Sequence, residues 1–176
     1  MNNGKLQKLT LTAMLAALGI VLPFFTAQLP QIGNMLLPMH FPVLLCGFIC
    51  GWRYGLLLGL LLPLARSLMF GFPPLMPIAL AMAAELAAYG FISGFLSERF
   101  PSAKISRLYV NLLAAMLGGR LLWGIAMAFL LGANAQAFTL KMFVLGAFVY
   151  ALPGIALQLL IIPALVYAYR AGHSVI

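Results

Sequence analysis

Three charged side chains lie within segments of the sequence that are otherwise apolar: Arg66, Glu85 and Arg120. An ionised group at the centre of a bilayer costs about 2.5–3.5 kcal/mol on insertion scales, so such residues usually face the interior of a helical bundle and serve a substrate or an ion. A carboxylate and two guanidinium groups can make charge-assisted hydrogen bonds to a small polar ligand. The three residues therefore predict a polar pocket inside a membrane bundle.

The composition of the chain is that of a membrane protein. Of its 176 residues, 65% are hydrophobic and 7% are charged, and the mean hydropathy is +1.11. No soluble core of this size could bury so much apolar surface. The net charge of +8 would suggest nucleic acid in a soluble protein, but the Lys and Arg residues lie at the ends of apolar runs. This placement indicates membrane topology rather than a polyanionic partner.

The apolar runs predict an all-α, polytopic membrane protein, with residues 1–176 forming one domain of six transmembrane helices. The run from Met39 to Phe70 is interrupted at Gly51-Trp52-Arg53-Tyr54-Gly55. As one helix it would be about 45 Å long, too long for a bilayer core of about 30 Å, so two spans fit better. We expect Pro63 to kink the third span, and Pro153 and Pro163 to bend or break the sixth. The predicted spans cover approximately residues 9–28, 39–51, 54–70, 77–96, 109–131 and 142–169.

The distribution of basic residues predicts the orientation. With six spans and the N-terminus inside, only Arg66 and Lys141 lie at the outer side. If residues 39–70 formed a single crossing, the basic residues after the 77–96 span would fall opposite Lys5 and Lys8. Because Lys and Arg are enriched in cytoplasmic loops, both termini are expected in the cytoplasm. The residues assigned to that side are Lys5, Lys8, Arg53, Arg99, Lys104, Arg107 and Arg170.

Several polar and aromatic residues are expected at a common depth. From the helical rise, Glu85 lies about 12 Å and Arg120 about 16 Å inside the outer ends of their spans. Tyr89 follows Glu85 at i+4, and Trp123 follows Arg120 at i+3, so each pair shares a helical face. The alternative is a purely structural Glu85–Arg120 ion pair with the aromatic residues as packing. The predicted ligand-binding residues are His40, Arg66, Glu85, Tyr89, Arg120, Trp123 and Tyr150, with Asn34 in the loop after the first span.

Enzymatic functions have little support in the sequence. The segment Gly90-Phe91-Ile92-Ser93-Gly94 is similar to the serine motif of rhomboid-type intramembrane proteases, but His40 is predicted near the opposite face and His173 lies in the tail. A serine nucleophile needs a base within hydrogen-bond reach, so we expect no enzyme. A stand-alone secondary transporter that uses Glu85 to carry a proton is the alternative, although inverted repeats are not visible. The chain has no phosphate-binding loop for ATP, so a partner would have to supply the energy.

The two cysteines, Cys46 and Cys50, are interpreted as small packing residues. They are four residues apart in an apolar run, where their Cα atoms would lie near the upper limit for a disulfide. Two thiols alone do not complete a zinc site, and we expect neither a metal ion nor a cofactor.

Small residues predict close helix packing at two kinds of surface. Ala13 and Ala17 form a small-xxx-small face on the first span, which would let a helix of another protein approach closely. The glycines of later spans are expected to serve internal packing. They are Gly47, Gly51, Gly55, Gly59, Gly90 and Gly94.

Four segments carry a resemblance that extends over nearly the whole chain. They are Leu37-Pro38-Met39-His40-Phe41-Pro42-Val43-Leu44-Leu45-Cys46-Gly47-Phe48, Pro63-Leu64-Ala65-Arg66-Ser67, Gly71-Phe72-Pro73-Pro74 and Glu85-Leu86-Ala87-Ala88-Tyr89-Gly90. With six spans and the Ala13-x-x-x-Ala17 pattern, the chain resembles the substrate-binding S component of energy-coupling factor (ECF) transporters. It is most similar to the branch for pantothenate and for pyridoxine or hydroxymethylpyrimidine.

The resemblance implies a mechanism in the plasma membrane of a prokaryote. The S component would bind a water-soluble vitamin from outside, in a pocket capped here by residues 28–39 and 71–77. It would then dock through Ala13 and Ala17 on a membrane partner, the T component, which is driven by two cytoplasmic ATPases. Toppling of the S component in the membrane would release the vitamin inside.

The charge of the predicted pocket favours an anionic vitamin. Two arginines against one glutamate leave a net positive charge, so Arg66 and Arg120 could hold the carboxylate of pantothenate. A neutral pyridoxine or hydroxymethylpyrimidine would instead stack on Trp123 or Tyr150 and bond to Glu85. Both types of ligand remain open at this point.

Overall fold

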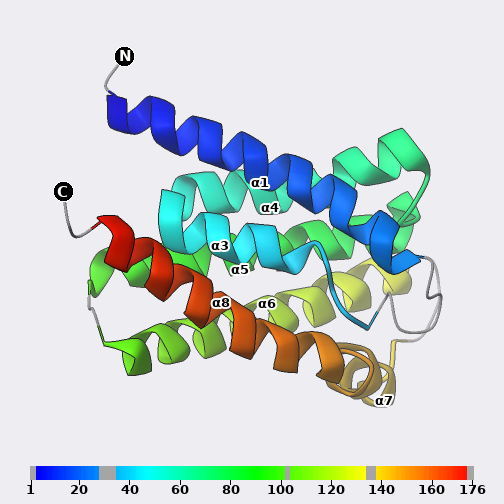
Figure 1. Cartoon of the computed structure of the whole chain (residues 1–176). Coiled ribbons are helices and arrows are strands. Elements are labelled where there is room, and N and C mark those ends of the chain that lie inside the picture. The colour runs from blue at the N-terminus through cyan, green and yellow to red at the C-terminus, as the bar shows by residue number, and fades with distance from the viewer. Residues whose placement is uncertain (1–2, 28–34, 102–103, 134–137, 174–176) are drawn as a thin grey trace.

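The computed structural model describes residues 3–27, 35–101, 104–133 and 138–173, and within these ranges every regular element is a helix (Figure 1). The all-α class predicted from the sequence is confirmed. The helices are α1 (Asn3–Ala27), α3 (His40–Cys50), α4 (Trp52–Phe70), α5 (Leu80–Arg99), α6 (Ile105–Ala133), α7 (Leu140–Val144) and α8 (Leu152–His173), with π-helical turns η1 (Leu75–Ala79) before α5 and η2 (Leu145–Val149) after α7.

Helix α5 lies at the centre of the bundle. It packs against α3, α4 and α6, while α1 packs against α3 and α4, and α8 packs against α3 and α6. Figure 1 shows α1 and α8 at opposite edges of the bundle. This arrangement buries Glu85 and Tyr89 of α5 behind the neighbouring helices.

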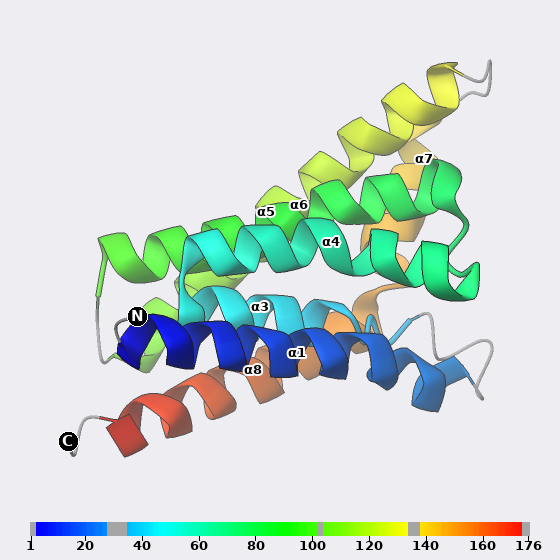
Figure 2. The ribbon, with the colours of Figure 1, turned by 90° about the horizontal axis from the view of Figure 1, so that it is seen from above.

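Both chain ends lie at the same end of the bundle (Figures 1 and 2). The starts of α1, α4 and α6 lie at this end, with the ends of α3, α5 and α8. Most basic residues therefore gather there, whereas Lys141 lies at the start of α7, at the other end. The bundle thus carries its positive charge asymmetrically along its long axis.

Among the residues that the structure describes, five helical segments are long and apolar enough to cross a membrane. They are Gly4–Phe25, Trp52–Phe70, Leu75–Arg99, Ile105–Gly132 and Leu152–Gly172, and the shorter His40–Cys50 and Leu140–Val149 are also apolar. These helices make the chain a polytopic membrane protein.

Gly51 explains why residues 39–70 do not form one long helix. Its φ of 102° is in a region that L side chains rarely adopt, and its N–H donates to the carbonyls of Cys46 and Gly47 at the end of α3. The chain reverses here, and α4 runs back beside α3 (Figure 2). Pro63 lies inside α4, as expected.

The span predicted over residues 142–169 is divided near Pro153, where a bend or a break was expected. The chain forms α7 and η2 over residues 140–149 and begins a new helix, α8, at Leu152. Pro153 has no amide proton to donate to the carbonyl of Val149, which favours a break at this point, and its place as the second residue of α8 suits a proline. The 22 residues of α8 would span about 33 Å, enough to cross a bilayer without the preceding turns.

Glycines bring α3, α4 and α5 into backbone contact near the chain ends. A Cβ on Gly55 would lie 2.6 Å from the carbonyl oxygen of Gly90, and a Cβ on Gly90 would overlap the carbonyl of Gly55. Gly47 and Gly94 likewise stand against Ser93 and Trp52. The internal-packing role predicted for these glycines is confirmed at the α4–α5 contact.

We predict that Gly90→Ala lowers the stability of the protein by about 1–3 kcal/mol, because the added methyl group overlaps backbone that cannot move without separating α4 from α5. Gly132→Ala in α6 is the matched control, since a Cβ there meets nothing within 4 Å and should raise stability by about 0.5–1 kcal/mol. Thermal unfolding in detergent measures both. Equal midpoints for the two variants would contradict the packing described here.

Candidate functional site

Three ionisable side chains from α3, α5 and α6 meet inside the bundle. Oε1 of Glu85 lies 2.9 Å from an Nη1 of Arg120 and 3.4 Å from Nε2 of His40. The three residues are 2%, 4% and 1% exposed, respectively. The structure thus brings together residues separated by 80 positions along the chain, and we refer to His40, Glu85, Tyr89 and Arg120 as the polar cluster.

Local sequence explains how the polar cluster forms. Glu85 and Tyr89 share one face of α5, and the ring of His40 lies edge-on to that of Tyr89 with centroids 5.2 Å apart. Gly119 precedes Arg120 on α6, and a side chain there would overlap the ring of Tyr89. The glycine therefore allows α6 to approach α5 closely enough for Arg120 to reach Glu85.

Several polar atoms of the cluster have unused hydrogen-bonding capacity. Within the described ranges, the hydroxyl of Tyr89, Nε and Nη2 of Arg120 and Nδ1 of His40 are buried without a hydrogen-bond partner. Buried polar groups are nearly always paired, and in a membrane bundle there is little bulk water to pair them. Together with the acceptor oxygens of Glu85, these donors could bind a small ligand that carries both acceptors and donors.

Gln158 on α8 is a further buried polar residue, and the sequence-based prediction missed it. Its side chain is fully buried, and neither Oε1 nor Nε2 has a partner among the described residues. The signal was its spacing, because Gly154, Gln158, Ile162 and Val166 recur every four residues and form the buried face of α8. An amide in the middle of that face is as unusual as a charge.

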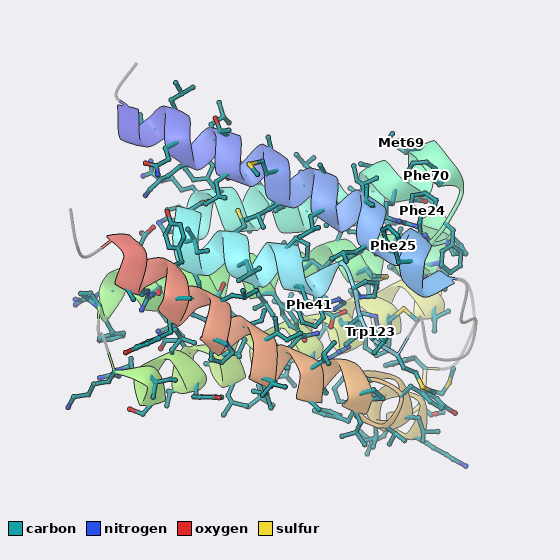
Figure 3. All side chains as sticks on the ribbon, viewed as in Figure 1. Phe24, Phe25, Phe41, Met69, Phe70 and Trp123 are labelled. Carbon is teal, nitrogen blue, oxygen red and sulfur yellow. The ribbon has the colours of Figure 1, made fainter. Side chains whose placement is uncertain are left out.

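The expectation that Arg66 joins the other polar residues is wrong. An Nη1–H of Arg66 donates to the carbonyl of Ile20 in α1 at 2.6 Å. Its guanidinium also lies 4.9 Å from the ring centroid of Phe24 and 5.7 Å from that of Phe70. Figure 3 shows Phe24 and Phe70 together at the end of α1, well separated from Trp123.

The aromatic candidates have different environments. Trp123, one turn beyond Arg120, packs against Phe138 and Phe143 with centroids 6.1 and 6.4 Å apart, and its ring borders Gly146 of η2. Residues 138–149 thus cover α6 near Trp123. Tyr150 lies in the bend before α8 with 54% of its surface exposed, and its place in the binding site stays a prediction. Asn34 lies outside the described residues.

The structure also locates the Ala13/Ala17 face and the two cysteines. Ala13 and Ala17 are exposed on α1, on the face turned away from α3 and α4. Cys46 and Cys50 are free thiols, both buried, and Sγ of Cys46 lies 3.6 Å from the hydroxyl oxygen of Thr12. In the described ranges, no group of three or more His, Cys, Asp or Glu side chains is placed to hold a metal ion.

Comparison with known proteins identifies the family of the chain. Residues 7–166 match the family described as "ECF transporter, substrate-specific component". No curated protein and no solved structure gives a match. The match spans nearly the whole chain, including every residue of the polar cluster and Gln158. The chain therefore belongs to the substrate-specific components of the ECF transporters.

Proposed function

We propose that this protein is the vitamin-binding subunit of an ECF-type importer in a prokaryotic plasma membrane. It captures a small water-soluble vitamin from outside and delivers it by docking on a membrane-embedded T component that two cytoplasmic ATPases drive. Family membership supports the role in substrate binding. The polar cluster is the observation that supports a specific place for the substrate.

The geometry of the polar cluster favours ligand binding over a purely structural ion pair. A structural ion pair between α5 and α6 needs only the contact between Glu85 and Arg120. Helices can associate in lipid without any ion pair. A purely structural pair leaves unexplained why Tyr89 and Arg120 retain buried donors within the described ranges. A ligand with acceptor groups would pair these atoms. The same argument favours a binding subunit over a proton-coupled transporter, which needs only one titratable group.

We further propose that α1, α3, α4, α5, α6 and α8 cross the membrane, with both termini in the cytoplasm. The basic residues at the end of the bundle that holds the termini support this orientation. His40 begins α3, Glu85 lies in the second turn of α5 and Arg120 lies near the middle of α6, so the polar cluster is deep inside the bundle. The substrate would enter from the outer side.

Arg120 supports an anionic substrate. Its Nη1 faces Glu85, while Nε and Nη2, which form the adjacent edge of the guanidinium, have no partner among the described residues. Two parallel N–H groups on one edge suit bidentate binding of a carboxylate. The sequence-based prediction of pantothenate depended on Arg66 and Arg120 together. Because Arg66 contacts α1, the free edge of Arg120 is now the reason why pantothenate is the first candidate. Pyridoxine and hydroxymethylpyrimidine follow.

We predict that Glu85→Gln or Arg120→Ala weakens vitamin binding by tenfold or more, about 1.4 kcal/mol, because each removes a charged group of the cluster. A single replacement leaves the other charge buried and unpaired. The double variant Glu85→Gln/Arg120→Gln removes both charges, so it has no unpaired buried charge. Equilibrium binding of radiolabelled pantothenate to purified protein, with unlabelled pyridoxine and hydroxymethylpyrimidine as competitors, measures the effect. Unchanged affinity in all three variants would assign these residues to the scaffold.

The two buried arginines should differ in their effects. We predict that Arg66→Ala lowers the unfolding midpoint, since the carbonyl of Ile20 and the rings of Phe24 and Phe70 lose their partner, but changes vitamin affinity less than threefold. Arg120→Ala is the matched comparison. A loss of affinity in Arg66→Ala as large as in Arg120→Ala, at a temperature where both variants are folded, would place Arg66 in the binding site.

We also propose that the exposed Ala13/Ala17 face of α1 is the docking surface for the T component. Ala13→Trp or Ala17→Trp should leave vitamin affinity unchanged and abolish uptake by cells, because a large side chain prevents close helix approach. Leu18→Trp is the control, since Leu18 is already bulky and is 44% exposed beside that face. Continued uptake by both alanine variants would instead indicate a transporter that works without a partner.

A further inference from the structure

We propose that Gln158 determines substrate specificity by binding an uncharged amide group of the vitamin whose carboxylate pairs with Arg120. The inference rests on the proposed function and extends the site to a fourth helix, α8. It identifies the substrate class as a molecule with an anionic end and a neutral group that both donates and accepts hydrogen bonds.

Burial without a partner is the first observation. Gln158 has no exposed surface, and both polar atoms of its carboxamide lack a hydrogen-bond partner within the described ranges. A buried amide left unpaired destabilises the protein, whereas an apolar residue of similar volume would pack without this cost. Its presence on an otherwise apolar helix face therefore points to a partner that arrives from outside the chain.

The position of Gln158 along α8 is the second observation. The N–H of Gly154 donates to the carbonyl of Met35 at 3.0 Å, and Met35 lies five residues before His40. Gln158 lies one helical turn further along α8, on the same face as Gly154. This places its side chain at about the depth of His40, at the start of α3.

The neighbours of α8 bring Gln158 to the side of the polar cluster. Within the described part of the chain, α8 packs on α3 and α6, the helices that carry His40 and Arg120, and Figure 1 shows α8 crossing both. Ile162, one turn further along α8, belongs to the same buried core as Ala115 and Met116 of α6.

The chemistry of the side chain then selects the ligand group. A carboxamide offers two N–H donors and one carbonyl acceptor, and it carries no charge. It pairs well with another amide, which presents the complementary C=O and N–H. Sites built to bond such a group reject analogues that lack it, because their own polar atoms are then left unpaired. Pantothenate carries a carboxylate and an amide, and so fits both Arg120 and Gln158.

The test compares pantothenate with its ester analogue, in which oxygen replaces the amide N–H. Wild-type protein should bind the ester at least tenfold more weakly than the amide. Gln158→Leu should bind pantothenate at least tenfold more weakly than wild type and should no longer distinguish the two ligands, since the variant has no acceptor for the N–H. Double-mutant-cycle analysis of the four affinities isolates this contact.

The matched control is Asn111→Leu, which removes a different buried amide. Asn111 lies on α6, nine residues and about 13 Å from Arg120, and is 4% exposed. This control should keep the wild-type preference for the amide. Unfolding of ligand-free protein supplies a second readout, because Gln158→Leu should unfold at the wild-type temperature or higher if its amide has no partner in the protein.

Two results would overturn the inference about Gln158 and leave the proposed function intact. One is an unchanged amide-to-ester ratio in Gln158→Leu. The other is a clearly lower unfolding temperature of the ligand-free variant, which would show that Gln158 bonds within the bundle. A wild-type protein that binds neither pantothenate nor its ester would instead refute the proposed substrate, and this inference with it.

Discussion

The contact between Glu85 and Arg120 constrains how the central helices can be arranged, because a charge buried without a partner in lipid is costly. Glu85 must face α6, which in turn requires Gly119 at the point where the two helices approach. His40 then completes the group from α3, at 3.4 Å from the same carboxylate oxygen. The relative rotation of α3, α5 and α6 about their axes follows from this one buried pairing.

Close backbone packing and the polar cluster are neighbours in the bundle. Glycines of α3, α4 and α5 allow backbone contact, and a Cβ on Gly59 would overlap the backbone of Leu86, next to Glu85. The polar cluster carries several donors that are unpaired in the described ranges. Rigid packing beside the cluster can hold the helices in place while these groups accept a ligand.

Composition and hydropathy predicted the helical class and most helix positions, because length and apolar content depend only on local sequence. The cluster of His40, Glu85, Tyr89 and Arg120 could also be predicted, since charges in apolar segments are conspicuous and the i+4 spacing fixes a shared face. The depth of a residue in the membrane does not determine which neighbouring helix its side chain faces, however. Arg66 and Tyr150 lie at a suitable depth, but the first faces α1 and the second is exposed in a bend. Gln158 escaped notice because a single uncharged amide hardly changes the hydropathy of an apolar helix.

Arg66 gives α1 an anchor point. Only 11% of the apolar stretch of this helix is buried, so its attachment to the rest of the bundle is slight along most of its length. At its far end, Pro23 interrupts the regular hydrogen bonding of the helix, and Arg66 binds the carbonyl of Ile20 in the preceding turn while the rings of Phe24 and Phe70 meet at 5.0 Å. Arg66 therefore joins this end of α1 to the end of α4, where the chain continues through η1 into α5.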